Sequence, residues 1–209
     1  YTIGDLARCD RALIISRLGK LGEVIHDYAN GIDDSPVISE YNDKDVKSVG
    51  NGMTFKRDLT GLSDIKISIK ALSDIVASRL RRYGLKCSTI QVTIKNPQLK
   101  TITRQRTLAA PTYLAREIAS MAMEIIRASW NLNSPIRMLT ITGSSLVPAD
   151  NAPEQLTLFD LNGREEQEKQ EKLEVTIDKI RSKFGTSSIS FGSIIHNDLG
   201  IDEPGDKKH

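Results

Sequence analysis

Alternating hydroxyl, amide and cationic side chains occupy the stretch 88–108, STIQVTIKNPQLKTITRQRTL. Ile90, Val92 and Ile94 take every second position in its first half, and Thr, Gln and Lys stand between them. This period of two, with β-branched residues supplying the propensity, is typical of a strand with one buried and one exposed face. The polar groups of the exposed face can contact a polyanion. The alternative is an ordinary solvated sheet face.

The second half of this stretch is a nearly all-polar strand, 100–107, which follows a turn at residues 96–98. If Ile102 points into the core, Arg104 and Arg106 point inward as well, because side chains alternate between the two faces of a strand. Arginine is rarely buried without a partner. We therefore expect a bulge or a shifted register that turns both guanidinium groups to the exposed face.

A second candidate site is the sequence LGKLG at 18–22, between two expected helices. Gly19 and Gly22 allow close backbone approach, and the N–H groups that open the next helix can face a phosphate oxygen, with Lys20 beside them. The pattern predicts the hairpin of a helix-hairpin-helix unit. An ordinary tight turn between helices is the alternative.

A third candidate is the segment 155–159, QLTLF, which places three large apolar residues in a polar linker. The amide of Gln155 and the side chains of Leu156, Leu158 and Phe159 make a compact anchor for a groove on another protein. The alternative is that Leu158 and Phe159 fasten the linker to their own domain.

The charge of the chain is unevenly distributed, although the formal net charge is only +2. Residues 44–110 carry fourteen Lys and Arg against four Asp, whereas residues 150–183 carry nine acids and six bases. The basic region has no lipid-facing amphipathic helix, so it favours phosphates over a membrane as partner. No apolar run approaches the length of a membrane span, which predicts a soluble protein without a membrane contact.

Catalytic patterns are missing from the sequence. It holds no pair of acids beside an expected strand, no phosphate-binding glycine loop and no clustered His and Cys that would make a zinc site. We expect no catalytic residue, no metal ligand and no cofactor in this chain. Cys9 and Cys87 are too few for a disulfide framework and are interpreted as reduced thiols of a cytoplasmic protein. Because the chain starts at Tyr1 inside an expected helical region, we expect a fragment of a longer protein.

The chain is expected to contain five regions. Residues 1–35 form a small helical unit, in which Thr2 and Asp10 are candidate helix caps, and 36–45 is a polar linker. Residues 46–147 form the main domain and 148–163 a second linker. Residues 164–209 hold a charged helix, whose late apolar stripe could dock on a partner or on the body, followed by a disordered tail.

The main domain opens with a strand at 46–57, where Gly50 and Gly52 indicate a bulge or a closely approaching ligand. Apolar residues at helical spacing then run from 62 to 83, and Gly84 predicts the end of that helix.

After the hairpin, a helix opened by Pro111 ends near Trp130, and a last strand covers 136–142. The order β-α-β-β-α-β predicts an α+β fold with a four-stranded antiparallel sheet and two helices on one face, as in the ferredoxin-like split unit. The helices would cover the side of Ile90, Val92 and Ile94, which leaves the Thr, Gln, Lys and Arg side open.

Three ordered groups of motifs resemble the C-terminal half of a Y-family (translesion) DNA polymerase of the bacterial DinB/UmuC kind. The first, TIGDLA at 2–7 with LGKLG at 18–22 and YANGIDDSPV at 28–37, is similar to the thumb. The second, KSVGNGMT at 47–54, is similar to the leading strand of the little-finger domain, and the third, QLTLF at 155–159, to the peptide that binds the sliding clamp.

This resemblance implies a monomer that grips primer-template DNA with its thumb and with the open sheet of its little finger. Contacts to phosphates would dominate, because a polymerase must accept any template. The expected DNA-binding residues are Gly19, Lys20, Gly22, Lys47, Ser48, Lys56, Gln91, Thr93, Lys95, Thr103, Arg104, Gln105, Arg106 and Thr107. The expected clamp-binding residues are Gln155, Leu156, Leu158 and Phe159.

The resemblance also implies that the Mg-dependent nucleotidyl transfer of the parent polymerase belongs to palm and finger domains upstream of this chain. A rival interpretation is a non-catalytic, polymerase-like adaptor that binds DNA and the sliding clamp. An Asp near the start of the full reading frame and an Asp-Glu pair about a hundred residues later would favour the polymerase. An unrelated RNA-binding sheet would expose aromatic residues for base stacking, and the hairpin has none.

Overall fold

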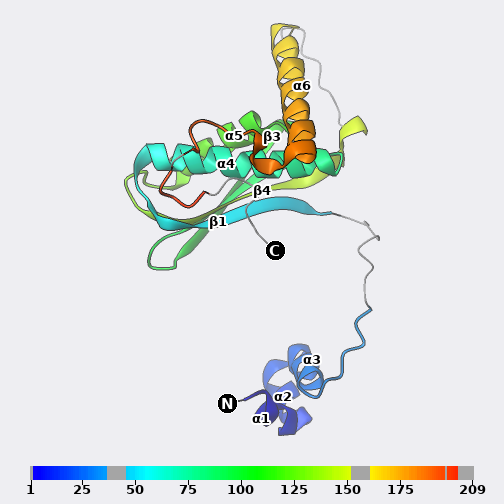
Figure 1. Ribbon diagram of the computed structural model, residues 1–209. Coiled ribbons are helices and arrows are strands. Elements are labelled where there is room, and N and C mark those ends of the chain that lie inside the picture. Colours follow the sequence, from blue (N-terminus) through cyan, green and yellow to red (C-terminus); the bar gives the residue numbers. More distant parts are fainter. Residues whose placement is uncertain (1, 37–45, 152–160, 196, 202–209) are drawn as a thin grey trace. The chain divides into compact units, whose positions relative to one another are not determined.

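The computed structural model describes residues 2–36, 46–151, 161–195 and 197–201. The chain divides into two compact units, residues 1–44 and 45–209. The first unit contains the helices α1 (Ile3–Arg8), α2 (Arg11–Leu18) and α3 (Lys20–Ala29) (Figure 1). Thr2 and Asp5 form the capping box of α1, and the Asp10 carboxylate accepts the Ala12 N–H at 2.9 Å to cap α2. Both caps are confirmed as the sequence predicts them.

The second unit is built on a four-stranded antiparallel sheet with the strand order β1-β4-β2-β3. The elements in chain order are β1 (Ser48–Leu59), α4 (Gly61–Arg82), β2 (Leu85–Lys95), β3 (Thr101–Thr112), α5 (Ala115–Ser129), β4 (Ile136–Pro148) and α6 (Leu161–Phe184), with short 3-10 turns at Ala149–Asn151 and Thr186–Ser188. The predicted α+β class and β-α-β-β-α-β order are confirmed. Each β-α-β connection passes over one intervening strand, but β1 and β3 form the edges, whereas the ferredoxin order places them at the centre.

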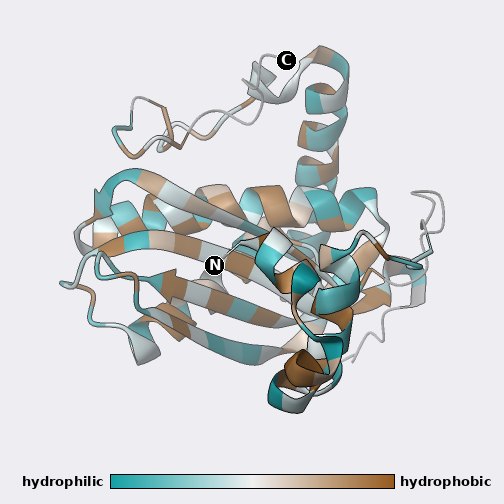
Figure 2. Cartoon of the chain, turned by 90° about the horizontal axis from the view of Figure 1, so that it is seen from below, coloured by the Kyte–Doolittle hydropathy of each residue, from teal (hydrophilic) through white to brown (hydrophobic). Residues whose placement is uncertain are grey.

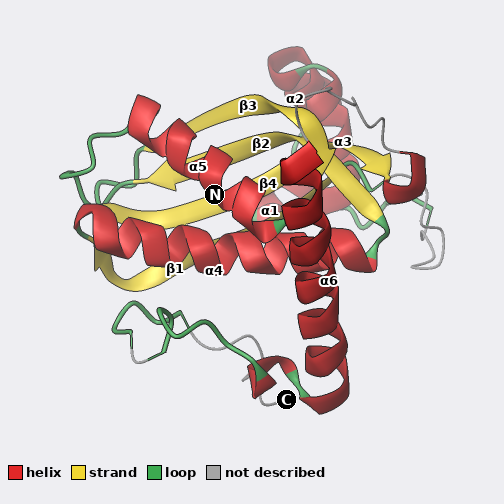
Figure 3. Ribbon diagram, turned by 90° about the horizontal axis from the view of Figure 1, so that it is seen from above, coloured by secondary structure: helices red, strands yellow, loops and turns green. Residues whose placement is uncertain are grey.

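Helices α4 and α5 cover one face of the sheet, as Figure 3 shows from above. Ile90, Val92 and Ile94 of β2 are at most 1% exposed beneath them, which confirms the predicted buried face. Gly84 follows the end of α4 and has φ +63°, in the left-handed region that favours glycine. The core is therefore the layer between the sheet and these two helices.

Helix α5 starts four residues after Pro111, where the sequence predicts its opening, because β3 continues through Pro111 to Thr112. Proline is tolerated there because β3 is an edge strand and its register is interrupted near this point. Strand β4 likewise runs to Pro148 and not to residue 142. Both differences lie at element ends, where sequence patterns are least informative.

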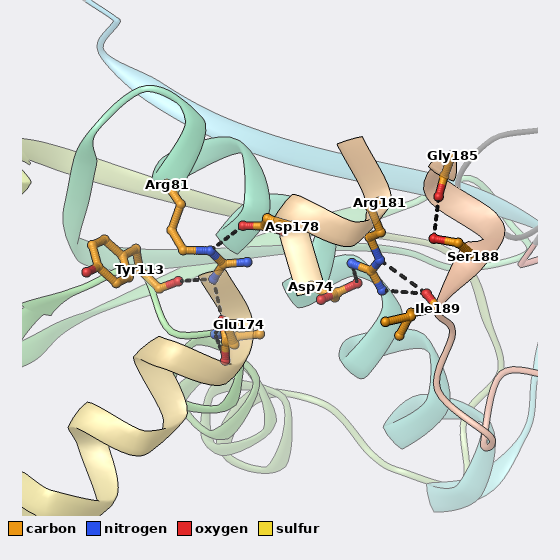
Figure 4. A network of polar contacts seen from close by, with 10 residues as sticks. Asp74, Arg81, Tyr113, Glu174, Asp178, Arg181, Gly185, Ser188 and Ile189 are labelled. Carbon is orange, nitrogen blue, oxygen red and sulfur yellow. Dashed lines mark hydrogen bonds and ion pairs between the residues drawn. The ribbon is translucent and has the colours of Figure 1, made fainter. Parts of the chain in front are cut away.

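Helix α6 is fastened to α4 and α5 by buried charges (Figure 4). Arg81 of α4 donates from Nε to Asp178 at 2.6 Å, and from a terminal nitrogen to Glu174 and to the Tyr113 carbonyl oxygen. Both oxygens of Glu174 also accept the N–H of Ala115, at 3.1 and 3.2 Å, so that an α6 carboxylate caps the first turn of α5. The side chains of Arg81 and Glu174 are only 7% and 6% exposed.

A second buried pair lies two helical turns further along α6. Arg181 donates to the Asp74 carboxylate of α4 at 2.7 Å, and both side chains are close to 10% exposed. The apolar stripe of this helix, which could dock on a partner or on the body, consists of Leu173, Ile177, Ile180 and Phe184. Leu173 and Phe184 are 53% and 66% exposed, whereas Ile177 and Ile180 are partly buried. Buried charge pairs, together with only part of the stripe, therefore hold α6 on the body.

The segment after α6 packs on the body as far as residue 201, which corrects the prediction of a disordered tail for the described part. Ile194, Leu199 and Ile201 are buried within the main core. The Leu199 carbonyl oxygen accepts the Lys56 N–H at 2.9 Å, and Asp198 accepts from the Arg57 guanidinium at 2.7 Å. That hydrogen bond from Arg57 is the main cause that lowers the pKa of the Asp198 carboxyl.

Candidate nucleic-acid interface

The sheet face that points away from α4 and α5 is a regular grid of mostly polar residues, interrupted only by Gly50, Gly52 and Met138. Register places its residues in four rows of four across β1, β4, β2 and β3. Figure 2 views the sheet from below, and hydrophobic and hydrophilic residues alternate along its strands. The rows are Ser48, Ser144, Thr89 and Thr107; Gly50, Thr142, Gln91 and Gln105; Gly52, Thr140, Thr93 and Thr103; and Thr54, Met138, Lys95 and Thr101. We call these sixteen residues the polar face.

The polar face carries hydroxyl and amide groups, one cation and no carboxylate. Lys95 is the cation, and the hydroxyls of Thr93 and Thr103 are hydrogen-bonded to each other at 3.0 Å. Such groups donate hydrogen bonds to anionic oxygens without demanding one fixed geometry. An acid-free surface of this kind tolerates a polyanion in close contact.

Seven of the predicted DNA-binding residues meet on the polar face. They are Ser48, Gln91, Thr93, Lys95, Thr103, Gln105 and Thr107. Sequence reasoning missed the contribution of β4, which supplies Thr140, Thr142 and Ser144 to the centre of the grid. A sequence signal for this contribution exists: these three residues alternate with the buried Leu139 and Ile141, which is the period of a half-buried strand.

Gly50 and Gly52 sit in regular ladder positions, and the register shift of β1 comes only after Thr54. A Cβ atom at Gly50 would lie 2.5 Å from Oγ1 of Thr142. A Cβ atom at Gly52 would lie 2.3 Å from Oγ1 of Thr140. The predicted bulge at the glycines is therefore wrong. Glycine is required there because cross-strand threonines occupy the space of its side chain.

Arg104 and Arg106 lie on the helix side of the sheet, opposite the polar face. They pair with Val92 and Ile90 in unbroken register, so the predicted bulge or shift at these residues is wrong. Both are nevertheless exposed, because β3 is an edge strand that α5 does not cover completely. Arg106 approaches Glu124 of α5 at 3.6 Å, with both side chains about half exposed. The arginines thus flank the polar face along the β3 edge.

Lys47 and Lys56, the two remaining predicted lysines of the second unit, lie near the opposite edge of the sheet. Lys47 is exposed directly before β1. Lys56 is exposed near the end of β1, and a Cβ atom at Gly200 would lie 2.5 Å from its Cγ, so its aliphatic stem runs along the C-terminal segment. Cations therefore stand at both edges of the grid.

The glycine hairpin of the first unit is a tight α2–α3 corner. Gly19 has φ +61° and precedes α3, whose first residue is the exposed Lys20. Gly22 is buried inside α3, its N–H donates to the Gly19 carbonyl oxygen at 2.9 Å, and an added Cβ would lie 2.6 Å from the Ile14 carbonyl oxygen. The structural role of Gly22 is thus close helix packing, and the prediction that N–H groups at the start of α3 bind a phosphate concerns the residues before it.

The predicted clamp-binding residues Gln155, Leu156, Leu158 and Phe159 lie outside the described residues. Within the described ranges, no three His, Cys, Asp or Glu side chains gather closely enough to hold a metal ion. In the same ranges no helix is both long and apolar enough to span a membrane. Both cysteines are free, and burial raises the pKa of the Cys87 thiol to about 12, so that it stays protonated at neutral pH.

Comparison with known proteins gives a consistent set of relatives. Residues 46–158 match the model of the impB/mucB/samB family C-terminal domain. The chain is 41% identical over 198 residues to DNA polymerase IV of Clostridium kluyveri, a match that covers 93% of this chain and 49% of the relative. It is 39% identical over 201 residues to DNA polymerase IV of Acetivibrio thermocellus, with 96% and 49% covered. For DNA polymerase IV 1 of Bacillus subtilis the identity is 33% over 195 residues, with 93% and 46% covered. The chain spans about half the length of these curated relatives.

Proposed function

This chain belongs to the impB/mucB/samB family, as a C-terminal portion of a Y-family polymerase, and we propose that it holds the DNA and the sliding clamp for a translesion DNA polymerase. In this proposal the nucleotidyl transfer, with its Mg²⁺ ions, takes place in palm and finger domains upstream. The present chain supplies affinity for primer-template DNA and a tether to the clamp. It does not contribute a catalytic residue.

The observation that carries the proposal is the acid-free polar face with cations at its edges. A two-stranded ribbon such as β2–β3 is narrow enough to enter the major groove of a duplex. Threonine and glutamine of the polar face then contact sugars and phosphates, while Arg104 and Arg106 reach the phosphates along one strand. These contacts carry little sequence information, which suits a polymerase that must accept every template.

A direct experiment measures binding of this chain to a labelled primer-template duplex over a series of salt concentrations, with and without the sliding clamp. We expect salt-steep binding that is indifferent to sequence, and a clamp complex that forms independently of DNA. Clamp binding without DNA binding would refute the proposed grip on DNA and leave only the tether to the clamp as the function of this chain.

The substitutions Thr93→Val and Thr103→Val together test the polar face itself. They remove a hydroxyl pair, joined at 3.0 Å, while keeping shape and β propensity. We expect DNA affinity to fall by a factor of about 3 to 10, equivalent to roughly one hydrogen bond, with an unchanged salt slope because no charge is lost. Anisotropy titrations at several salt concentrations measure both quantities. An unaltered affinity would exclude this row from the interface.

The substitutions Leu158→Ala and Phe159→Ala test the proposed clamp anchor. Large apolar side chains dominate short peptide anchors, and we expect clamp affinity to fall at least about tenfold. Surface plasmon resonance with immobilised clamp measures this loss, and a DNA titration of the same variant supplies the control. Retained clamp affinity would assign the two side chains to the body of this chain instead.

A further inference from the structure

A groove lies in the corner where α6 meets α4 and α5, on the helix side of the sheet. The angle between α6 and the two helices is visible in Figures 1 and 3. The groove has a volume of about 440 Å³, within the usual range of ligand pockets of about 300 to 1,000 Å³. Its apolar lining comes from Ile69, Ala119 and Met123 on the floor, Leu173 and Ile177 on the α6 wall, and Phe191 beyond α6.

The buried ion pairs that fasten α6 also create this groove. Because α6 is held by charges at Glu174, Asp178 and Arg181, its apolar residue Leu173 is left 53% exposed at the groove wall. Lys70 lies over the ring of Phe191, with Nζ 4.2 Å from the ring centre, and fixes the far wall. The groove is thus a formed apolar surface that the described residues leave open.

The charge at the groove is positive. The acids in its lining, Asp74 and Glu174, are each paired with an arginine. Lys66 and Arg116 line the groove as well, and neither forms an ion pair with a described residue. An occupant that brings carboxylates therefore gains two cations at the rim without competing with an existing partner.

We infer that this groove binds an acidic segment of a partner protein, which inserts two or three large apolar side chains between α5 and α6 and places carboxylates against Lys66 and Arg116. Apolar anchors buried in a pocket supply most of the affinity. The complementary charges around them supply specificity. The groove lies on the side of the sheet opposite the polar face. A partner bound there leaves the proposed DNA surface free, and this inference does not depend on the proposed function.

The four methionines of the chain allow a test that locates the occupant. Met123 lines the groove, whereas Met138 lies on the polar face, so their methyl groups report the two surfaces separately. The probe is a short fluorescein-labelled peptide that alternates Asp with Leu and Phe, and its control has Lys in place of Asp. We expect the acidic peptide to bind and to shift the ¹³C-methyl signal of Met123, assigned with Met123→Leu, while Met138 stays unchanged.

Charge reversal then tests the rim. We expect Lys66→Glu combined with Arg116→Glu to weaken the acidic peptide at least about tenfold and to strengthen the lysine peptide. Arg127→Glu, at another exposed position on α5, is the matched control and should leave the peptide affinity unchanged. Absence of binding, a shift at Met138 in place of Met123, or equal binding of both peptides would overturn the inference. Concentration-dependent self-association that shifts Met123 without peptide would also overturn it, because the occupant would then be a second copy.

Discussion

Replacement of Arg81 by leucine is expected to detach α6 from the body and to lower the free energy of unfolding by about 3 kcal/mol. The guanidinium is 7% exposed and is the shared partner of Glu174 and Asp178. Without it, a nearly buried carboxylate has no counter-charge, and the least costly response is for α6 to leave. Hydrogen exchange of α6 amides, read beside urea unfolding, measures both effects.

Two companion variants make this result specific. In the triple variant Arg81→Leu, Glu174→Leu and Asp178→Leu, we expect stability within about 1 kcal/mol of the original, because apolar replacement of a whole buried ion cluster is often neutral. Arg82→Leu makes the same change at the exposed neighbouring position and should alter stability by about 0.5 kcal/mol or less. Unchanged exchange of α6 in Arg81→Leu would show that the ion pairs do not hold this helix.

Local patterns predicted the sheet and the two helices that cover it. Ile90, Val92 and Ile94 in β2 have the period of a half-buried strand, and all three are buried in the core. The capping box of Thr2 and Asp5 is a contact between near neighbours, so the sequence alone contained it. Features of this kind depend on residues within one element, which is why periodicity and capping rules recover them.

The docking of α6 depends on pairs far apart in the chain, and its residues are of the type that usually faces solvent. Glu174 and Arg181 stand in a helix with many exposed charges. No local sequence pattern indicates that they form ion pairs with Arg81 and Asp74 of α4. The apolar stripe, which leaves docking on a partner or on the body open, is exposed at Leu173 and Phe184 and partly buried at Ile177 and Ile180. Charge pairing of this type becomes visible only when the tertiary arrangement is known.

The burial of the C-terminal segment was missed for a related reason. Ile194, Leu199 and Ile201 stand in a segment of weak apolar content with no period, which is typical of an unfolded end. They are buried because the segment returns to β1, where the Leu199 carbonyl oxygen accepts the Lys56 N–H and Asp198 binds Arg57. A long-range return of the chain leaves no periodic trace in sequence.

Strand parity predicts that Arg104 and Arg106 lie on the helix side of the sheet, whereas their charge predicts that they are exposed. The structure satisfies both predictions, because an edge strand can expose residues on the helix side where α5 ends short of it. The order of strands in the sheet, which the sequence did not reveal, is the missing information. The two arginines therefore belong to the rim of the proposed interface and not to its centre.

Alanine at both Arg104 and Arg106 is expected to weaken binding to primer-template DNA of any sequence and to reduce the salt slope by about 2. Each guanidinium that contacts a phosphate releases about 0.9 counterion, and two such contacts account for about a tenfold change in affinity between 50 and 200 mM salt. The loss of the Arg106–Glu124 pair should matter little to stability, since both groups are half exposed. Anisotropy titrations over a salt series measure the slope.

The matched control is Arg116→Ala with Arg127→Ala, which removes the same charge from exposed positions on α5. If the edge arginines contact phosphates, this control keeps the original slope while the β3 variant loses about two units. Equal slopes in both variants would mean that only the overall charge matters, and the β3 edge would be excluded from the interface. If the β3 variant binds DNA more weakly but keeps the original salt slope, the two arginines do not contact phosphates. The contact with DNA would then be made by the polar face alone, through Lys95 and the neighbouring hydroxyls.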